Sequence, residues 1–200
     1  YRHDFNLYPL RYWQSIDAAD RQGIAEIRYI TGLYDYFDAL REAHPNLIID
    51  NCASGGRRID LETMKRSLVL TRSDYLWDPS GQQIHTYNLS KWLATTGIGA
   101  ASLDTYSVRS GYGQHFVLAQ NYNALTDAQW DQAYQHLSEE QELRHLFEGD
   151  FATLTGTTND NTACVAFEYV LPGGSEGLVQ VFRRESCAAE TMLIFLVGLD

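Results

Sequence analysis

The stretch "NLIIDNCASGGRR" (46–58) indicates the fold class, because it joins a short apolar run directly to a glycine-rich turn. The run at 46–53 is too short for a helix, is rich in branched aliphatic residues and follows Pro45, which is typical of a buried strand. The stretch "SLVLTRSD" (67–74) repeats the strand pattern. Buried strands that alternate with helices predict a parallel sheet of an α/β fold.

The expected helices flank these strands. Between residues 17 and 44, isoleucine, leucine and phenylalanine recur three and four positions apart, with Asp17 or Asp20 as a possible N-cap and Pro45 past the end. This spacing predicts an amphipathic helix. Further helices are expected at 59–66, at 80–97 with Gly97 as C-cap, and at 127–148 with Asp127 after Thr126 at its start; strands are expected at 98–105 and 115–122, with a short turn or helix between them.

The pattern changes after Asp150, where three β-rich runs replace the alternation of strands and helices. They are "NTACVAFEYVL" (161–171), "EGLVQVFRR" (176–184) and "ETMLIFLVGL" (190–199). A Pro-Gly-Gly turn at 172–174 separates the first two, which predicts antiparallel strands. We therefore expect two domains, an α/β part at 1–152 and an antiparallel β part at 153–200.

Composition and charge exclude several classes of partner. With 44% hydrophobic and 20% charged residues, the chain is expected to fold around a core. Its 26 acidic and 15 basic residues give a net charge of −11, which repels nucleic acid and anionic membrane surfaces. No membrane span or secretory signal is visible. Because Tyr1 stands inside an element, the compartment, cytoplasmic or secreted, stays open.

The cysteines do not predict a metal site. Cys52, Cys164 and Cys187 are odd in number and lack CxxC or Cys/His spacing, which argues against zinc and against a dense disulfide framework. Cys164 and Cys187 could pair, but the sequence favours two buried free thiols. No metal or organic cofactor is expected.

Candidate catalytic residues stand where function concentrates in parallel α/β folds, at the carboxyl ends of strands. Asp4, Cys52 with its glycines, Asp74 and Asp104 occupy such positions. An aspartate after a strand is more often a helix cap or a turn residue, and Asp104 is the weakest of these candidates. The neighbouring residues therefore decide which aspartates are of interest.

Side chains two positions apart share one face of a strand. Arg2, Asp4 and Asn6 should then point the same way, and a guanidinium beside Asp4 should lower the pKa of that carboxyl, which suits an ionised nucleophile. Arg72 and Asp74 should also share a face. A general acid needs a raised pKa, so either Arg72 points at substrate or Asp74 is tuned mainly by Asp4. Two carboxylates in unlike environments are the machinery of retaining glycoside hydrolysis.

The glycine turn and an aromatic residue suggest a sugar as ligand. Glycines after a strand let backbone amides approach a ligand, and the turn has neither GxGxxG nor Walker spacing, so we favour sugar hydroxyls over phosphate. A domain acting on phosphorylated sugars is the alternative, with an anion at 54–57. Trp77 stands three residues past Asp74, where it could either stack on a sugar face or have a plain packing role.

These motifs together resemble a known family. The order of "RHDFN" (2–6), "LIIDNCASGGRR" (47–58), "TRSD" (71–74), "EEQELRHLFEGDFATL" (139–154) and "LVGLD" (196–200) is similar to the carboxyl-terminal half of the bacterial α-galactosidases called melibiases, of glycoside hydrolase clan D. The resemblance implies strands four to eight of a (β/α)8 TIM barrel in 1–152, followed by a small, incomplete antiparallel β domain. The first three strands would lie upstream.

The resemblance also implies roles for residues of this chain. Asp4 matches the nucleophile and Asp74 the general acid/base, while Cys52 and Gly55 match the segment near the galactose hydroxyls. The expected substrate is a galactoside oligosaccharide. The predicted substrate-binding residues are Arg2, Asn6, Cys52, Gly55, Arg72 and Trp77.

Two motifs depart from the family pattern and leave alternatives open. This chain has Arg2-His3-Asp4 where the family usually has Lys-Trp-Asp, and Asp74-Tyr75 where it commonly has Asp-Asn. The alternatives are an α-N-acetylgalactosaminidase, a galactosyl-transferring relative and a non-catalytic carbohydrate-binding homologue. A homo-oligomer of the full-length form is also left open, and the 200 residues alone are expected to be inactive.

Overall fold

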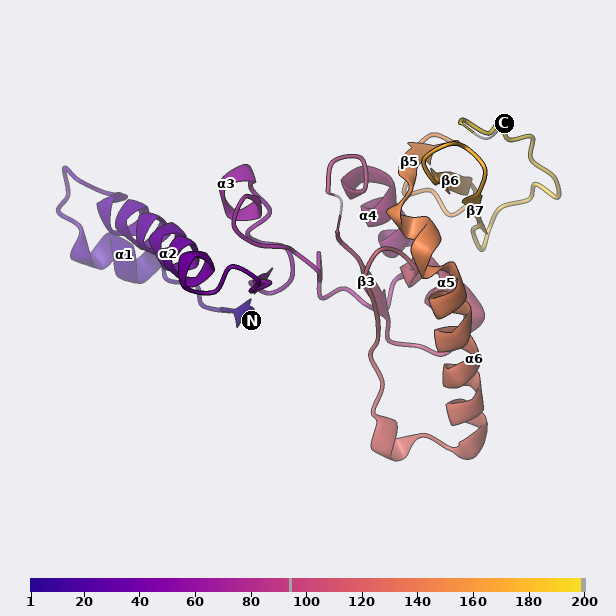
Figure 1. Ribbon diagram of the computed structural model, residues 1–200, viewed down its shortest axis with the longest axis horizontal. Helices are drawn as coiled ribbons and strands as arrows, with labels where there is room; N and C mark the ends of the chain where they lie inside the picture. Colours follow the sequence, from indigo (N-terminus) through magenta and orange to yellow (C-terminus); the bar gives the residue numbers. More distant parts are fainter. Residues whose placement is uncertain (94, 199–200) are drawn as a thin grey trace. The chain divides into compact units, whose positions relative to one another are not determined.

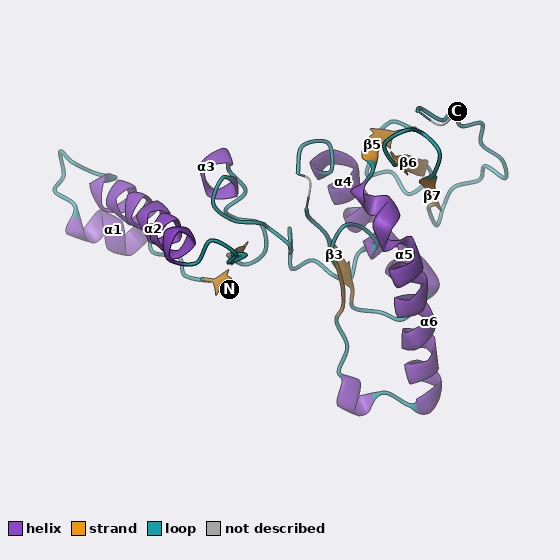
Figure 2. Ribbon diagram, in the orientation of Figure 1, coloured by secondary structure: helices purple, strands orange, loops and turns teal. Residues whose placement is uncertain are grey.

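The computed structural model describes residues 1–93 and 95–198 (Figure 1). The chain forms two compact units, a first unit Tyr1–Ser73 and a second unit Asp74–Asp200. Both contain the predicted parallel strands, and the second also contains an antiparallel sheet. Figure 2 shows how short the strands are beside the helices and loops. None of the helices in the described residues is long and apolar enough to cross a membrane.

A parallel strand pair forms the centre of the first unit. β1 (Arg2–Asp4) pairs with β2 (Asp50–Cys52), so that Arg2 lies opposite Asp50 and Asp4 opposite Cys52. The expected strand at 67–74 is wrong in extent, because only single β-bridges form in it, at Leu68, which bridges to Asp50, and at Thr71. Between these two bridges, the amide of Leu70 donates to the Asp50 carboxylate at 3.3 Å.

Helices cover this pair. α2 (Ile24–Ala43) buries Leu33 and Phe37 against Ile49, as its periodicity predicted. It begins seven residues later than Asp17, because Gly23 adopts a left-handed conformation with φ of 96°. Asp17 still serves the helix start, since its carboxylate accepts from the amide of Ala25 at 3.0 Å.

Two shorter helices complete the first unit. α1 (Leu10–Ile16) was not predicted. It is a short helix that buries none of its side chains, and such a helix does not need the apolar stripe by which a helix is recognised in a sequence. α3 (Leu61–Met64) lies within the expected helix at 59–66, and the side chain of Asp60 caps its first turn.

The second unit opens with α4 (Pro79–Leu89) and a second parallel pair, β3 (Ile98–Ala100) with β4 (Phe116–Leu118). α5 (Thr105–Gly111) connects the two strands. The expected C-cap at Gly97 is wrong, because α4 ends at Leu89. Gly97 instead faces the backbone of His115, where a Cβ would lie 1.7 Å from the carbonyl oxygen. The glycine allows a close approach of two backbones.

Beyond the parallel pair the chain passes through the 3-10 turn Tyr122–Ala124 into α6 (Asp127–Leu143), followed by the 3-10 segment Arg144–Glu148. The start of α6 is as predicted. The Thr126 hydroxyl accepts from the amide of Gln129, and the Gln129 side-chain oxygen accepts from the amide of Thr126. These two bonds form a capping box.

The antiparallel sheet has the order β5 (Asp150–Thr153), β6 (Cys164–Val170), β7 (Gly177–Arg183). β6, β7 and the turn between them were predicted, whereas β5 was not. The strand expected at 190–199 is wrong for residues 190–198, where the amide of Val197 donates to the buried Glu168 carboxylate at 2.6 Å. Residues 199–200, with the end of the "LVGLD" motif, lie outside the described residues.

One core joins both kinds of sheet in the second unit. Its buried side chains come from the parallel pair, the helices and the antiparallel strands, and include Ala100, Val108, Ala133, Phe167 and Phe182. The domain boundary at 152–153 stays a prediction.

Candidate active site

Asp4 lies at the carboxyl end of β1, next to Arg2, which contacts both Asp4 and Asp50. Arg2 Nε donates to Asp4 Oδ2 at 3.4 Å, which confirms that the two side chains share a face. Arg2 Nη1 also pairs with Asp50 Oδ2 on the neighbouring strand. Partial burial lowers the pKa of Arg2, but the hydrogen bond and charge of Asp50 outweigh it, so this pKa is raised. Asp4 remains accessible, with 39% of its side chain exposed.

Asn6 binds the glycine turn. Its Oδ1 accepts from the amide of Ser54 at 2.7 Å, and Ser54 and Gly55 both have positive φ, at 48° and 77°. The expectation that this turn offers its amides to a ligand is therefore wrong for Ser54, whose amide already has a partner within the protein. The phosphate alternative at 54–57 loses the same donor.

Close packing fixes the rest of the turn. A Cβ added at Gly56 would lie 2.4 Å from the carbonyl oxygen of Arg72. Gly55 is buried, and Cys52 is only 2% exposed. The turn is thus a rigid extension of β2.

Arg58 and Asp50 support the site but were missed by sequence reasoning. Arg58 Nε donates to Asn51 Oδ1 at 2.8 Å, and its Nη2 donates to the carbonyl of Cys52 at 2.7 Å. Burial lowers the pKa of Arg58. The paired arginines at the end of the glycine motif were the signal that could have revealed Arg58. Asp50 gave no such signal, because its link to Arg2 depends on the register of two strands 48 residues apart.

In the second unit, Asp74 is the first residue and is exposed. Trp77 is 66% exposed, and its ring packs edge-on against Tyr75, with centroids 4.8 Å apart. The ring contact with Tyr75 fits a plain packing role, and sugar stacking by Trp77 stays a prediction. The prediction that Arg72 and Asp74 share a strand face is wrong, since no strand covers these residues. Arg72 is 5% exposed.

A polar cavity follows Asp74 along the chain. It has a volume of about 450 Å³, and its lining includes Tyr75, Asp78, His85, Asn159 and Asn161. Asp78 also caps α4 by accepting from the amide of Ser80.

Asp104, the weakest candidate, is a helix cap. It accepts from the amide of Ser107 at 2.9 Å and from Ser102 Oγ at 2.6 Å. Partial burial raises the pKa of Asp104, but these hydrogen bonds outweigh it and the pKa is lowered.

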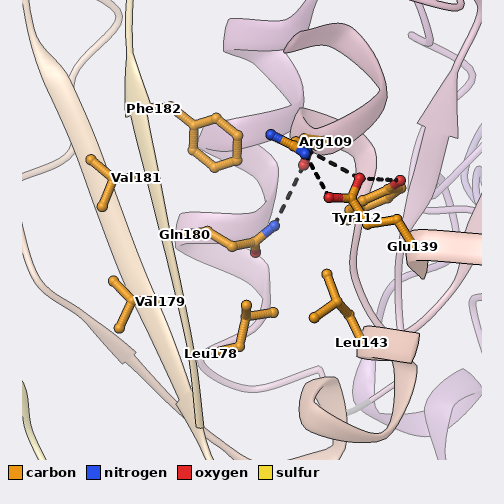
Figure 3. Close-up of a pocket in the computed structure, with 9 residues that line it drawn as sticks. All are labelled: Arg109, Tyr112, Glu139, Leu143, Leu178, Val179, Gln180, Val181 and Phe182. Atoms are coloured by element: carbon orange, nitrogen blue, oxygen red, sulfur yellow. Dashed lines mark hydrogen bonds and ion pairs between the residues drawn. The ribbon is translucent and has the colours of Figure 1, made fainter. Parts of the chain in front are cut away.

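Two further cavities have neither Asp4 nor Asp74 among their lining residues. One, of about 350 Å³ in the first unit, is bordered by Phe5, Trp13 and Tyr29. The other, of about 310 Å³, lies between α5, α6 and β7 (Figure 3). In the latter, Arg109 and Glu139 bind each other, at 2.6 Å. Within the described residues, no three His, Cys, Asp or Glu side chains form a group that could hold a metal ion.

Comparison with known proteins agrees with the resemblance. The melibiase family model matches residues 6–87. Alpha-galactosidase 1 of Pediococcus pentosaceus is 26% identical over 195 residues, which cover 90% of this chain and 26% of that protein. Alpha-galactosidase 2 of the same organism is 50% identical over 42 residues, 21% of this chain and 6% of that protein.

Solved structures share the fold. The GH36 α-galactosidase AgaA of Geobacillus stearothermophilus, solved in complex with raffinose, has a TM-score of 0.78 and 22% identity. The α-galactosidase of Lactobacillus brevis has a TM-score of 0.81 and 19% identity. Each comparison covers 100% of this chain and 29% or 28% of the other chain. This chain, which spans about a quarter of the length of its full relatives, is similar to the melibiase family of α-galactosidases, whose family model matches it over residues 6–87.

Proposed function

We propose that this chain is part of a retaining glycoside hydrolase that cleaves terminal α-galactosides. The observation that carries the proposal is Asp4, an accessible carboxylate at the carboxyl end of a parallel strand, next to a guanidinium that a second carboxylate holds in place. The match to the melibiase model and the similarity to an α-galactosidase support the substrate class. Raffinose, stachyose and 1-deoxygalactonojirimycin are bound by structural neighbours, which supports a galactoside oligosaccharide as substrate.

The proposed reaction uses two aspartates in turn. Asp4 attacks the anomeric carbon as Asp74 gives its proton to the departing oxygen, so the glycosidic bond breaks and a galactosyl ester of Asp4 forms. Asp74 then takes a proton from water, which attacks the same carbon and releases Asp4. This chemistry requires the two carboxyl groups to lie about 5 to 5.5 Å apart in the complete enzyme. A structure of the full-length protein with a bound galactose analogue measures that distance.

The surrounding residues have matching roles in this proposal. Arg2 holds a positive charge beside Asp4, and Asp50 prevents Arg2 from pairing with Asp4 alone. Trp77 presents an exposed ring on which a sugar face could stack. We also propose that β1, β2 and the bridge at Leu68 belong to strands four to six of a (β/α)8 barrel, and β3 and β4 to strands seven and eight; their parallel pairing supports this assignment.

The nucleophile is tested in the full-length protein by Asp4→Asn and Asp4→Ala. We expect each to lower kcat for an aryl α-galactoside by about a thousandfold or more, with galactose binding retained. Sodium azide should restore turnover only in Asp4→Ala and give a β-galactosyl azide, since the small anion occupies the vacated space. Hydrolysis that survives Asp4→Asn would exclude Asp4 as nucleophile. A protein without any hydrolysis to lose, but with galactose binding, would be the non-catalytic homologue.

The acid/base is tested by the leaving group. In Asp74→Ala, kcat/KM should fall about a hundredfold or more for a sugar leaving group, which needs a proton, but little for dinitrophenolate, which does not. Asp104→Asn is the matched control, because it preserves the helix cap in the same unit. Equal losses on both substrates would argue against Asp74 as the acid. Parallel assays with N-acetyl-α-galactosaminides and with acceptor sugars separate the two catalytic alternatives.

A further inference from the structure

Two cysteines face each other at one end of the antiparallel sheet. Cys164 is the first residue of β6, and Cys187 lies just beyond the end of β7. Their sulfur atoms are 3.2 Å apart, although the residues are 23 positions apart in the sequence. A disulfide has an S–S distance of about 2.05 Å. The sulfurs would therefore need to approach by only about 1.2 Å, within the range of small side-chain rotations.

Backbone hydrogen bonds place the second cysteine. The amide of Cys187 donates to the carbonyl of Arg184 at 3.0 Å, which forms a turn. The amide of Ser186 donates to Asn161 at 3.1 Å, and that of Arg184 donates to Ala163 at 3.4 Å. These bonds hold the turn at 184–187 against the segment that leads into β6. These backbone hydrogen bonds therefore bring the sulfur atom of Cys187 close to that of Cys164.

The same turn supports a neighbouring loop at 156–163. The guanidinium of Arg184, 1% exposed, donates to the carbonyls of Thr158 and Asp160, at 2.5 and 3.1 Å. Its Nε donates to Gln83 on α4 at 3.1 Å. Asn159 and Asn161 in this loop line the polar cavity with Tyr75 and Asp78. A covalent link at the base of the loop would restrain one wall of that cavity.

We propose that Cys164 and Cys187 form a reversible disulfide that fastens the loop at 156–163, with a low-molecular-weight disulfide as oxidant. One protein thiolate attacks oxidised glutathione, so a mixed disulfide forms and one glutathione thiolate leaves. The second protein thiolate attacks the protein sulfur of the mixed disulfide and expels the other glutathione thiolate. The cysteine pair loses two electrons, glutathione disulfide gains them, and the two protons end on the two glutathione thiols.

Exposure and charge set the order of these steps. Cys164 is partly exposed whereas Cys187 is buried, so Cys164 meets the oxidant first. The hydrogen bond with Cys187 raises the pKa of the Cys164 thiol, and burial adds to the effect. Since the thiolate is the nucleophile, oxidation should become faster as the pH rises.

Peptide mapping of the full-length protein tests the bond. Trypsin cleaves after Arg144, Arg183 and Arg184, which puts Cys164 and Cys187 in separate peptides. After treatment with oxidised glutathione we expect these peptides to be linked, and after reduction both should carry the alkylating label. Cys52, in the first unit, should be alkylated in both samples. Two labelled peptides after oxidation, or a lasting glutathione adduct on Cys164, would overturn the proposal.

Hydrogen exchange tests the effect on the loop. Oxidation should slow the exchange of amides in residues 157–163 by on the order of tenfold, because a cross-link restricts local opening. The variants Cys164→Ala and Cys187→Ala should show no response to the oxidant. A disulfide that forms without slowing this exchange would contradict the fastening role. Neither peptide mapping nor hydrogen exchange depends on hydrolytic activity, so this proposal can fail or hold independently of the proposed function.

Discussion

Arg2 connects the proposed nucleophile to the neighbouring strand. Its guanidinium contacts Asp4 at 3.4 Å and also pairs with Asp50, whose side chain is only 15% exposed. Asp50 additionally accepts from the amide of Leu70. One aspartate thus binds both the Leu70 amide and Arg2, and it sets the position of the charge beside Asp4. It is a positioning residue in the proposed reaction.

Removing the charge of Asp50 should therefore affect turnover more than stability. In the full-length protein, we expect Asp50→Asn to lower kcat for an aryl α-galactoside about tenfold, which corresponds to about 1.4 kcal/mol of barrier, because Arg2 then pairs with Asp4 alone. The loss of stability should stay below about 1 kcal/mol, since Arg2 is largely solvated. Asp38→Asn, which removes the surface partner of Arg66, is the control. Equal activity of the two variants would contradict a positioning role for Asp50.

At the scale of elements, an ion pair fastens α5 to α6. Arg109 on α5 binds both carboxylate oxygens of Glu139 on α6, at 3.1 and 2.6 Å (Figure 3). Tyr112 donates to the same carboxylate at 3.0 Å and to the carbonyl of His136 at 2.7 Å. The hydrogen bond from Arg109 is the main cause of the lowered pKa of Glu139, and partial burial opposes it.

This pair predicts a pH-dependent contribution to stability. Because the folded pKa of Glu139 lies below its ordinary value of 4.5, the stabilisation is present above pH 4.5 and is lost as the pH falls through the folded pKa. Above pH 4.5, Glu139→Gln should lower the free energy of unfolding, measured by urea denaturation, by less than about 1 kcal/mol, because both side chains are partly exposed. The difference from the parent should vanish in acid. Glu142→Gln, an exposed position on the same helix, should show no such pH dependence.

Sequence patterns predicted the elements with strong periodicity and failed where a residue has two uses. α2 was predicted because its apolar spacing acts locally, and α6 because the residues at its start do, whereas the predicted N-cap of α2 was wrong, since Gly23 takes that position. Gly97 was misassigned because a helix C-cap and a close backbone approach both require glycine, and the sequence does not separate them. The strand expected at 67–74 reduced to single bridges at Leu68 and Thr71, and the amide of Leu70 between them donates to the Asp50 side chain.

The candidate site was predictable to a similar degree. The alternation of side chains on a strand is local, so the contact between Arg2 and Asp4 could be expected. The contacts of Asp50 with Arg2 and of Asn6 with Ser54 join residues 48 positions apart. Such contacts depend on tertiary register, which composition and spacing do not encode. Arg72 and Asp74 were paired wrongly for a related reason, since alternation applies only within a strand.

At the scale of the whole molecule, activity should need more than these residues. The chain covers 26% of the curated relative that it matches over most of its length. We expect the isolated chain to release no measurable product from an aryl α-galactoside, whereas the full-length protein does, because a sugar must be enclosed on several sides for catalysis. Turnover by the isolated chain that disappears in its own Asp4→Asn variant would contradict this expectation.

The antiparallel sheet has a consequence for handling the isolated chain. Within the described residues β7 is an edge strand that pairs only with β6, and Val181 on it is about half exposed. An edge strand is a template on which a further copy can add a strand and begin aggregation. Mutual repulsion from the net charge of −11 opposes this, and dissolved salt weakens that repulsion. Dilute buffers of low ionic strength should therefore keep the chain monomeric, and concentrated salt should precipitate it.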